Sequence, residues 1–145
     1  MRKIPLMLKG SLVKASLMYA PNYQKDFNLY LAAADMTIAM VLVQEENGIE
    51  HPIYYLSRNL NDTEIKYSYI ETLALAAVQA IQRFRHYVLF RKTTILSDCN
   101  PMTYILSRQL LGGKYSKWIA ILQEFDLEFK KIQIKESPGI HGVTM

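Results

Sequence analysis

The sequence contains a single cysteine, Cys99, among its 145 residues. One thiol excludes an internal disulfide and a cysteine-based zinc site, and it is typical of a protein that works in a reducing compartment. No apolar run reaches the roughly 18 residues that a membrane-spanning helix needs. A glycine-rich phosphate loop and a nucleophile elbow are also missing, and the three histidines have no metal-binding spacing. These absences argue against nucleotide, serine-hydrolase and zinc chemistry.

Acidic residues are absent from the first 25 positions, which carry only basic charges, at Arg2, Lys3, Lys9, Lys14 and Lys25. An acid-poor, basic start is compatible with a mitochondrial import sequence, and a surface helix that ends at the turn Pro21-Asn22 is the simpler alternative. We expect residues 1–25 to form a basic linker helix. The expected location is the cytoplasm or the nucleus, with the mitochondrion as the alternative.

The remaining composition is that of an ordinary globular domain, with 50% hydrophobic and 21% charged residues. A chain of this length forms one domain and buries enough surface to fold without disulfides. We place that domain at residues 26–134 and expect residues 135–145, which show no periodicity, to be frayed. The net charge of +4 allows weak attraction to nucleic acid but does not demonstrate it.

The hydrophobic pattern predicts an α/β fold with a five-stranded mixed sheet flanked by helices. Residues 27–35, 38–46 and 50–58 read as an antiparallel meander, because Asn47-Gly48 is a strong hairpin signal. Residues 64–85 read as a long helix whose apolar side chains recur at three-and-four spacing, after helix-start residues at Asp62 and Thr63. Further elements follow in the order strand, helix, helix, strand, at residues 92–98, 101–108, 116–125 and 126–134. Strand-helix-strand units require parallel crossovers, so the sheet is expected to be mixed.

Several of these segments carry a family resemblance. The strand YYLSR, the Tyr67-Ser68 helix entry, the helix exit RFRHYVL and the block from Lys117 to Asp126, KWIAILQEFD, resemble the ribonuclease H domain that follows the polymerase in gypsy-type long-terminal-repeat retrotransposons. The resemblance runs from about Leu8 to Phe129, and it is strongest to the version in plant elements. It implies a five-stranded mixed sheet with helices, which agrees with the order of elements above.

Active members of that family cleave the RNA strand of RNA–DNA hybrids with four acids and two magnesium ions. The resemblance places the first three of these acids at Ala32, Leu73 and Asp98, and the fourth has no counterpart because residues 135–145 contain no Asp. Two divalent cations need several carboxylates, and only Asp98 is left. We therefore expect a pseudoenzyme with no cofactor, and magnesium only if some activity persists.

Two neighbouring acids are candidates for a rearranged site. Asp35 lies three residues beyond Ala32, which directs its side chain to the opposite face of a strand. Glu71 precedes Leu73 by two residues, about 200° around a helix, and is expected to face solvent. An active magnesium-dependent nuclease that uses Asp35, Glu71 and Asp98 is therefore the least favoured alternative.

If catalysis is lost, binding is the expected function. The chain resembles in this respect the connection domain of retroviral polymerases, which keeps the fold but has lost the catalytic acids. For nucleic acid, the candidates surround Gly112-Gly113: Arg108, Lys114, Tyr115, Lys117 and Trp118. The alternative is that Trp118 belongs to the core and that the lysines only solubilise the loop. For a protein partner, the edge strands and the tyrosine-rich strand 53–56 are available. A mitochondrial regulatory protein that acts through such a partner is a further alternative.

Overall fold

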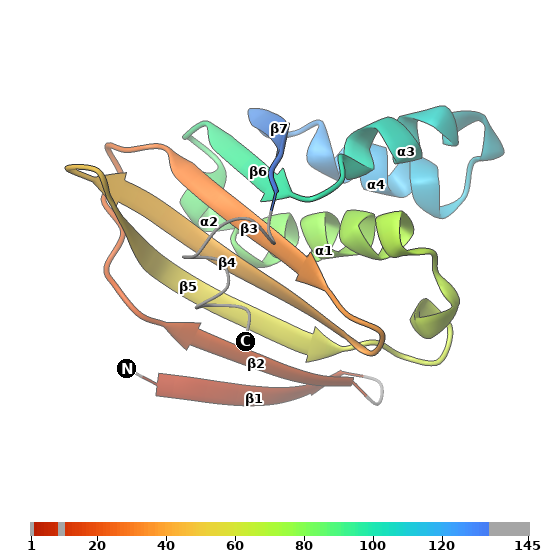
Figure 1. Cartoon of the computed structure of the whole chain (residues 1–145), viewed down its shortest axis with the longest axis horizontal. Helices are drawn as coiled ribbons and strands as arrows, with labels where there is room; N and C mark the ends of the chain where they lie inside the picture. The colour runs from red at the N-terminus through yellow and green to blue at the C-terminus, as the bar shows by residue number, and fades with distance from the viewer. Residues whose placement is uncertain (1, 9–10, 134–145) are drawn as a thin grey trace.

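One mixed sheet of seven strands organises the part of the chain that the structure describes, residues 2–8 and 11–133 (Figure 1). The structure is a computed structural model. The strand order is β1-β2-β5-β4-β3-β6-β7. Neighbours from β1 to β3 in this order are antiparallel, whereas β3 pairs with β6 and β6 pairs with β7 in parallel. The strand bounds are β1 Arg2–Leu8, β2 Ser11–Leu17, β3 Phe27–Ala33, β4 Thr37–Glu46, β5 Ile49–Asn59, β6 Thr93–Ser97 and β7 Leu127–Lys131.

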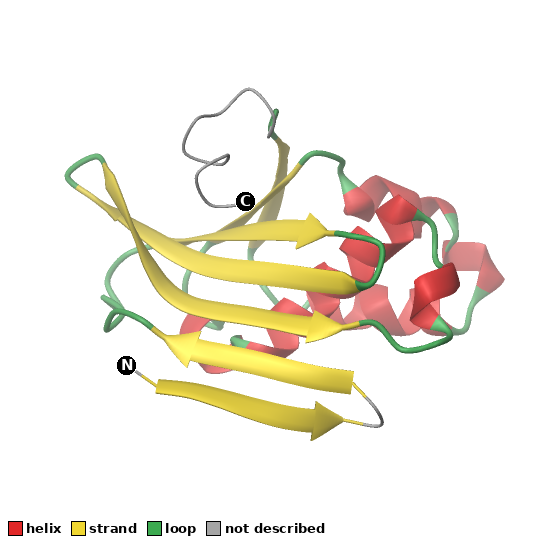
Figure 2. Cartoon of the chain, turned by 60° about the horizontal axis from the view of Figure 1, so that its bottom comes forward, coloured by secondary structure: helices red, strands yellow, loops and turns green. Residues whose placement is uncertain are grey.

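The helices gather on one face of this sheet (Figure 2). Their bounds are η1 Glu64–Lys66, α1 Tyr69–Arg83, α2 Arg85–Val88, α3 Pro101–Ser107, η2 Gln109–Leu111 and α4 Lys114–Leu122, where η denotes a 3₁₀ helix. The longest, α1, packs against β3 and β4 and also contacts α3 and α4. None of the helices in the described ranges is long and apolar enough to cross a membrane. The predicted mixed sheet with flanking helices is confirmed.

The amino-terminal segment differs from the expected linker helix, and that prediction was wrong. Residues 2–8 and 11–17 form the hairpin β1–β2, which raises the sheet from five strands to seven. The physical reason is the outer edge of β5, an eleven-residue strand whose backbone groups need partners. β2 supplies them in the register from Val13↔Arg58 to Leu17↔Tyr54. The expected frayed tail, residues 135–145, lies outside the described residues.

The long helix begins later than Asp62 and Thr63 indicate. Residues 64–66 form the 3₁₀ turn η1, and α1 starts at Tyr69 with Ser68 as its N-cap. The Ser68 Oγ accepts a hydrogen bond from the Glu71 backbone N–H at 3.3 Å, which satisfies one of the free donors at the start of the helix. The helix also ends at Arg83, and a second short helix, α2, follows it.

The core lies between α1 and the sheet. Of the five residues in the predicted apolar stripe, Leu73, Ala77, Ile81 and Phe84 are all 0% exposed, which confirms these four, whereas Ile70 is only partly buried. The four belong to the same cluster as the buried side chains of β3 and β4. A buried leucine or isoleucine side chain stabilises a fold by about 1.5–3 kcal/mol relative to exposure, so this interface contributes substantially to the stability of the fold.

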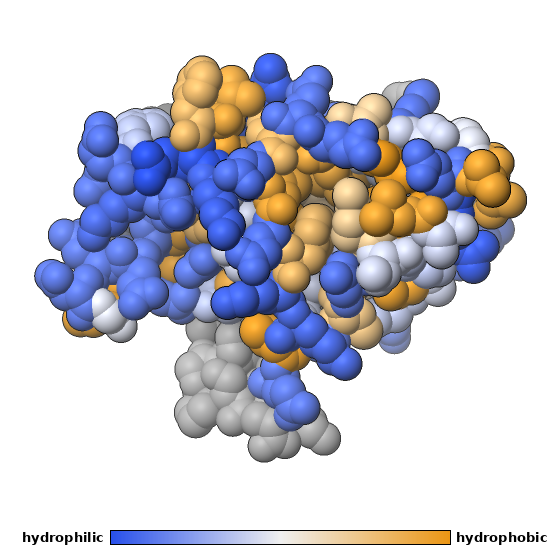
Figure 3. All heavy atoms as spheres, turned by 90° about the horizontal axis from the view of Figure 1, so that it is seen from above, coloured by the Kyte–Doolittle hydropathy of each residue, from blue (hydrophilic) through white to orange (hydrophobic). Residues whose placement is uncertain are grey.

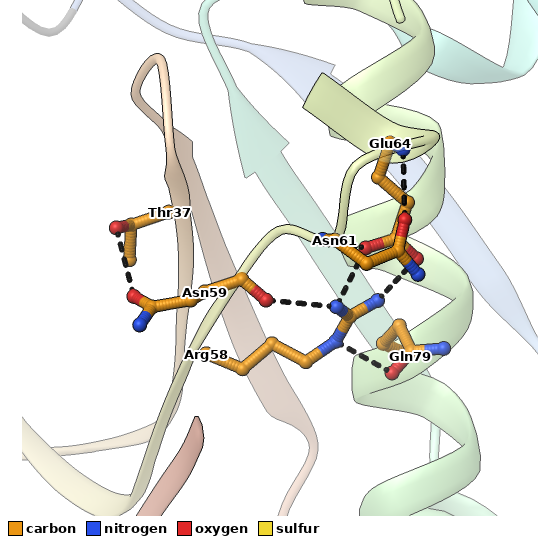
Figure 4. Close-up of polar contacts among 6 residues, drawn as sticks. All are labelled: Thr37, Arg58, Asn59, Asn61, Glu64 and Gln79. Carbon is orange, nitrogen blue, oxygen red and sulfur yellow. Dashed lines mark hydrogen bonds and ion pairs between the residues drawn. The ribbon is translucent and has the colours of Figure 1, made fainter. Parts of the chain in front are cut away.

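A buried ion pair joins the end of β5 to the start of the helical layer (Figure 4). The Nη1 and Nη2 groups of Arg58 donate to the two carboxylate oxygens of Glu64 at 2.7 and 2.8 Å, and the Nε donates to Gln79 of α1 at 3.2 Å. The two charged side chains are only 8% and 12% exposed. Burial raises the pKa of Glu64, but the hydrogen bonds from Arg58 and from the Asn61 backbone N–H outweigh it, so the pKa is lowered overall.

We expect Glu64→Gln to lower the free energy of unfolding by about 3 kcal/mol, because it leaves the Arg58 charge buried without an anionic partner. The carboxylate of Glu64 has a lower pKa folded than unfolded. Its contribution is therefore complete above the unfolded value and is lost as the pH falls through the folded value. Urea unfolding followed from neutral to acidic pH measures both effects.

Glu124→Gln is the matched control, because Glu124 pairs with Arg85 at 3.2 Å where both side chains are more than half exposed. Exposed pairs contribute about 0–1 kcal/mol. Equal losses in the two variants would contradict the structural role of the Arg58–Glu64 pair.

Candidate functional site

Three of the residues singled out from the sequence belong to elements that converge at one end of the sheet. β3 and β6 are parallel neighbours, and Ala32 lies near the carboxyl end of β3 while Asp98 directly follows β6. The amino end of α1, which carries Leu73, reaches the same place, because Tyr69 bonds to Asp98. This is the position where open α/β sheets bind their ligands.

Leu73 fills the position where an acid was expected in active relatives. Its side chain is 0% exposed and lies in the main apolar cluster. Ala32 is partly exposed, and strand alternation places it on the face of β3 opposite the buried Leu31. Neither side chain can bind a cation, and the buried leucine contributes packing instead.

Asp98 keeps its carboxylate but shares it with a neighbouring tyrosine. The Tyr69 hydroxyl lies 2.8 Å from Oδ1 and 2.9 Å from Oδ2 of Asp98. Burial, followed by the hydrogen bond to Asp98, raises the pKa of this phenol above its ordinary value. Tyr69 therefore stays protonated at neutral pH and donates to the carboxylate. Among the ion pairs of the described residues, none includes Asp98.

The two substitute acids form no metal-binding group with this carboxylate in the described part of the chain. Asp35 is exposed in the turn after β3, beyond the sheet. Glu71 was expected to face solvent, and that prediction was wrong, because it is 8% exposed. Its Oε2 lies 2.6 Å from the Lys114 Nζ and accepts a hydrogen bond from the Tyr115 hydroxyl at 2.9 Å. The reason is that α4 packs beside the start of α1, which the angle around a single helix does not reveal.

The pKa of Glu71 follows from these contacts. Burial raises it, but the hydrogen bonds from Lys114 and Tyr115 together lower it below its ordinary value. Glu71 is therefore a charged residue with two partners already in place. It is not a free ligand for a cation.

The residues at this end of the sheet do not fit a pair of magnesium ions. Two such ions need several anionic oxygens at fixed separation, and the positions here are an alanine, a buried leucine and an aspartate whose two oxygens face a phenol. Within residues 2–8 and 11–133, no group of three or more His, Cys, Asp or Glu could hold a metal ion.

Lys114 lies within a cluster of aromatic rings that includes two of the other predicted nucleic-acid contacts. Its Nζ is 3.8 Å from the ring centroid of Tyr67, 5.3 Å from that of Tyr115 and 5.7 Å from that of Trp118. Cation–π contacts at these distances stabilise the protonated amine. Trp118 is 8% exposed and belongs to the core. Lys114, Tyr115 and Trp118 thus make intramolecular contacts that fix α4 against α1.

Lys117 is exposed, whereas Arg108 is partly buried, with its Nε inaccessible to solvent. The Arg108 Cζ lies 4.6 Å from the Tyr104 ring centroid, and Lys117 is exposed on α4. Lys66 of η1 is also exposed, and it precedes Tyr67, which contacts Lys114. Among the described residues, none of these three cations forms an ion pair. We call Lys66, Arg108 and Lys117 the basic end of the molecule.

Three leucines next to the basic end are exposed, and the sequence reading missed them. Leu106, Leu110 and Leu111 are 43%, 100% and 67% exposed. Figure 3 shows apolar spheres at the end of the molecule where α3 and η2 lie, beside hydrophilic ones. Positive φ angles at Gly112 and Gly113 turn the chain here before α4 begins. The only signal in the sequence was the pair of leucines directly before the two glycines.

The fold and this end of the sheet define a ribonuclease H-like α/β domain. The family model of the RNase H-like domain found in reverse transcriptase matches residues 22–125. The chain belongs to this family.

Relatives among known proteins agree with the family. The chain is 36% identical over 130 residues to the retrovirus-related Pol polyprotein from transposon 297 of Drosophila melanogaster, and 32% identical over 122 residues to that from transposon opus of the same fly. These matches cover 90% and 83% of the chain but only 12% of each polyprotein.

A solved structure shows the same fold. The foamy viral protease-reverse transcriptase dRH in complex with double-stranded DNA matches with a TM-score of 0.64 at 19% identity. The match covers 77% of this chain and 20% of the viral one.

We expect Leu73→Glu to lower the free energy of unfolding by at least about 3 kcal/mol, because the new carboxylate is placed in an apolar core without a partner. Leu73→Met is the control, since a swap of similar volume costs less than about 1.5 kcal/mol. Chemical denaturation of both variants checks the expectation. A Leu73→Glu protein as stable as the parent would show that this position still accepts an acid.

Proposed function

We propose that this chain is a degenerate, catalytically inactive ribonuclease H module, of the kind that it resembles in plant gypsy-type elements, and that it acts by binding nucleic acid. The observation that supports the loss of catalysis is the state of the acid positions. Leu73 is fully buried among apolar side chains, and the one carboxylate, Asp98, accepts from Tyr69 with both oxygens. That arrangement lacks the ligands for two-metal chemistry.

Three observations support nucleic acid as the ligand. The similar foamy viral structure is a complex with double-stranded DNA. The chain carries a net charge of +4. The basic end carries Lys66, Arg108 and Lys117, which form no ion pair within the described part of the chain. Three phosphate contacts predict weak binding that depends on salt and not on sequence, because each neutralised phosphate releases counterions.

A protein partner is the second candidate, and the exposed leucines favour it. Leu106, Leu110 and Leu111 present apolar surface next to the basic end, and exposed apolar patches often mark interaction sites. The two candidates differ in their response to salt. Binding through phosphate contacts weakens steeply as salt rises, whereas binding through buried leucines changes little.

We expect the protein to bind a fluorescently labelled RNA–DNA hybrid with an affinity that falls as salt rises, as measured by anisotropy. Arg108→Ala and Lys117→Ala should each weaken binding and reduce the slope of log affinity against log salt by about 1. Lys14→Ala is the matched control, because Lys14 is an exposed lysine of β2 and is not one of the three residues of the basic end.

The same complexes with added magnesium test the loss of catalysis. Cleavage of the RNA strand should not exceed that of Asp98→Asn. Turnover that this substitution abolishes would overturn the proposal in favour of an active nuclease. Binding that is insensitive to salt and to both substitutions would instead favour the protein partner.

A further inference from the structure

The contact between Tyr69 and Asp98 involves both oxygens of the carboxylate. One hydroxyl lies almost equally far from both carboxylate oxygens, at 2.8 and 2.9 Å. Asp98 is partly buried and Tyr69 is 45% exposed, so the contact lies near the surface. A hydrogen bond to an ionised group is stronger than one between neutral groups. The hydroxyl thus occupies the region in front of the carboxylate that a bound cation would need.

Both partners are held in place by their own secondary structure. Tyr69 is the first residue of α1, directly after the Ser68 cap, whose backbone oxygen also accepts from the Thr72 hydroxyl at 2.9 Å. On the other side, the Ser97 hydroxyl donates to the Cys99 backbone oxygen at 2.6 Å, which fixes the backbone around Asp98. The contact is therefore preorganised by a helix start and a strand end.

The donor in this contact is neutral. Lys114, which lies beside the start of α1, is engaged by Glu71 at 2.6 Å. Asp98 therefore has a hydrogen-bond partner but forms no ion pair with a cation of the described residues. A carboxylate without a positively charged partner still attracts a cation. At Asp98, the Tyr69 hydroxyl competes with a cation for the carboxylate oxygens.

We propose that the Tyr69 hydroxyl takes the place of a divalent cation at Asp98, and that its removal opens a weak site for a single cation at this carboxylate. The inference rests on the proposed function, since it assumes that the chain no longer holds the two ions of an active enzyme. A lone carboxylate binds a hard cation weakly, with water filling the other positions. Tyr69 is therefore a positioning residue whose hydroxyl occupies the oxygens of Asp98 and keeps a cation from binding them.

Manganese alone is the probe, because it binds carboxylates and broadens the NMR signals of nearby amides. We expect Tyr69→Phe to raise the affinity for Mn²⁺ at Asp98 by about tenfold, which corresponds to about 1.4 kcal/mol. The broadening should centre on the backbone amides next to Asp98. The double variant Tyr69→Phe with Asp98→Asn should lose it.

Tyr30→Phe is the matched control, because the Tyr30 hydroxyl donates to the Glu50 carboxylate at 2.6 Å, in a Tyr–carboxylate pair that does not involve Asp98. This variant should leave the amides around Asp98 unchanged. Tyr69→Phe keeps the ring and therefore the fold, which circular dichroism checks, and Tyr69→Ala provides a second removal of the hydroxyl.

The inference is overturned if the parent protein binds Mn²⁺ at Asp98 as tightly as Tyr69→Phe does, or if neither Tyr69 variant gains affinity. It is also overturned if the gain survives Asp98→Asn. Failure of the proposed function has a different signature, which is cleavage of the hybrid by the parent protein. Cleavage and cation affinity are measured separately, so the two failures can be told apart.

Discussion

Apolar packing of α1 against β3 and β4 is the constraint on which the rest of this structure depends. Leu73 lies fully buried in that interface, at the position where the family resemblance places a metal-binding glutamate. A carboxylate and a core leucine make opposite demands on one site, because the first needs water or cations and the second must exclude water. Leu73 gains packing energy at this position, but it cannot serve as a metal ligand. The stability of the helix–sheet interface and the proposed loss of catalysis therefore both follow from this one residue.

The polar groups around this interface are arranged consistently with the replacement of a metal-binding acid by Leu73. Glu64 and Glu71, near the start of the helical layer, are each paired with a cation, and Asp98 accepts from Tyr69. Each carboxylate is thus satisfied within the chain, as buried polar groups must be. The helices α3 and α4 remain as an outer layer whose exposed charges and leucines are free to contact a partner. In our account, the fold is retained as a scaffold and its outer end provides the binding surface.

Much of the fold can be predicted from local patterns in the sequence. The alternation of apolar and polar residues in strands and the 3.6-residue period of apolar residues in α1 are both visible within short stretches of the chain. The hairpin β1–β2 could not be predicted in this way. In β2, Ala15 and Ser16 are both buried, which breaks the alternation, and the strand exists because β5 offers an edge. The contacts of the site were equally out of reach. Tyr69 and Asp98 are 29 residues apart and Glu71 and Tyr115 are 44 apart, so only the packing of separate elements brings them together.

The most direct test of this account is anomalous X-ray diffraction from crystals of the unmodified protein soaked in Mn²⁺. The account predicts that no anomalous peak lies within coordination distance of the Asp98 carboxylate, because the Tyr69 hydroxyl occupies that region and no second acid is present at Ala32 or Leu73. Two peaks beside Asp98, separated by the roughly 3.5–4 Å of a two-metal site, would contradict it.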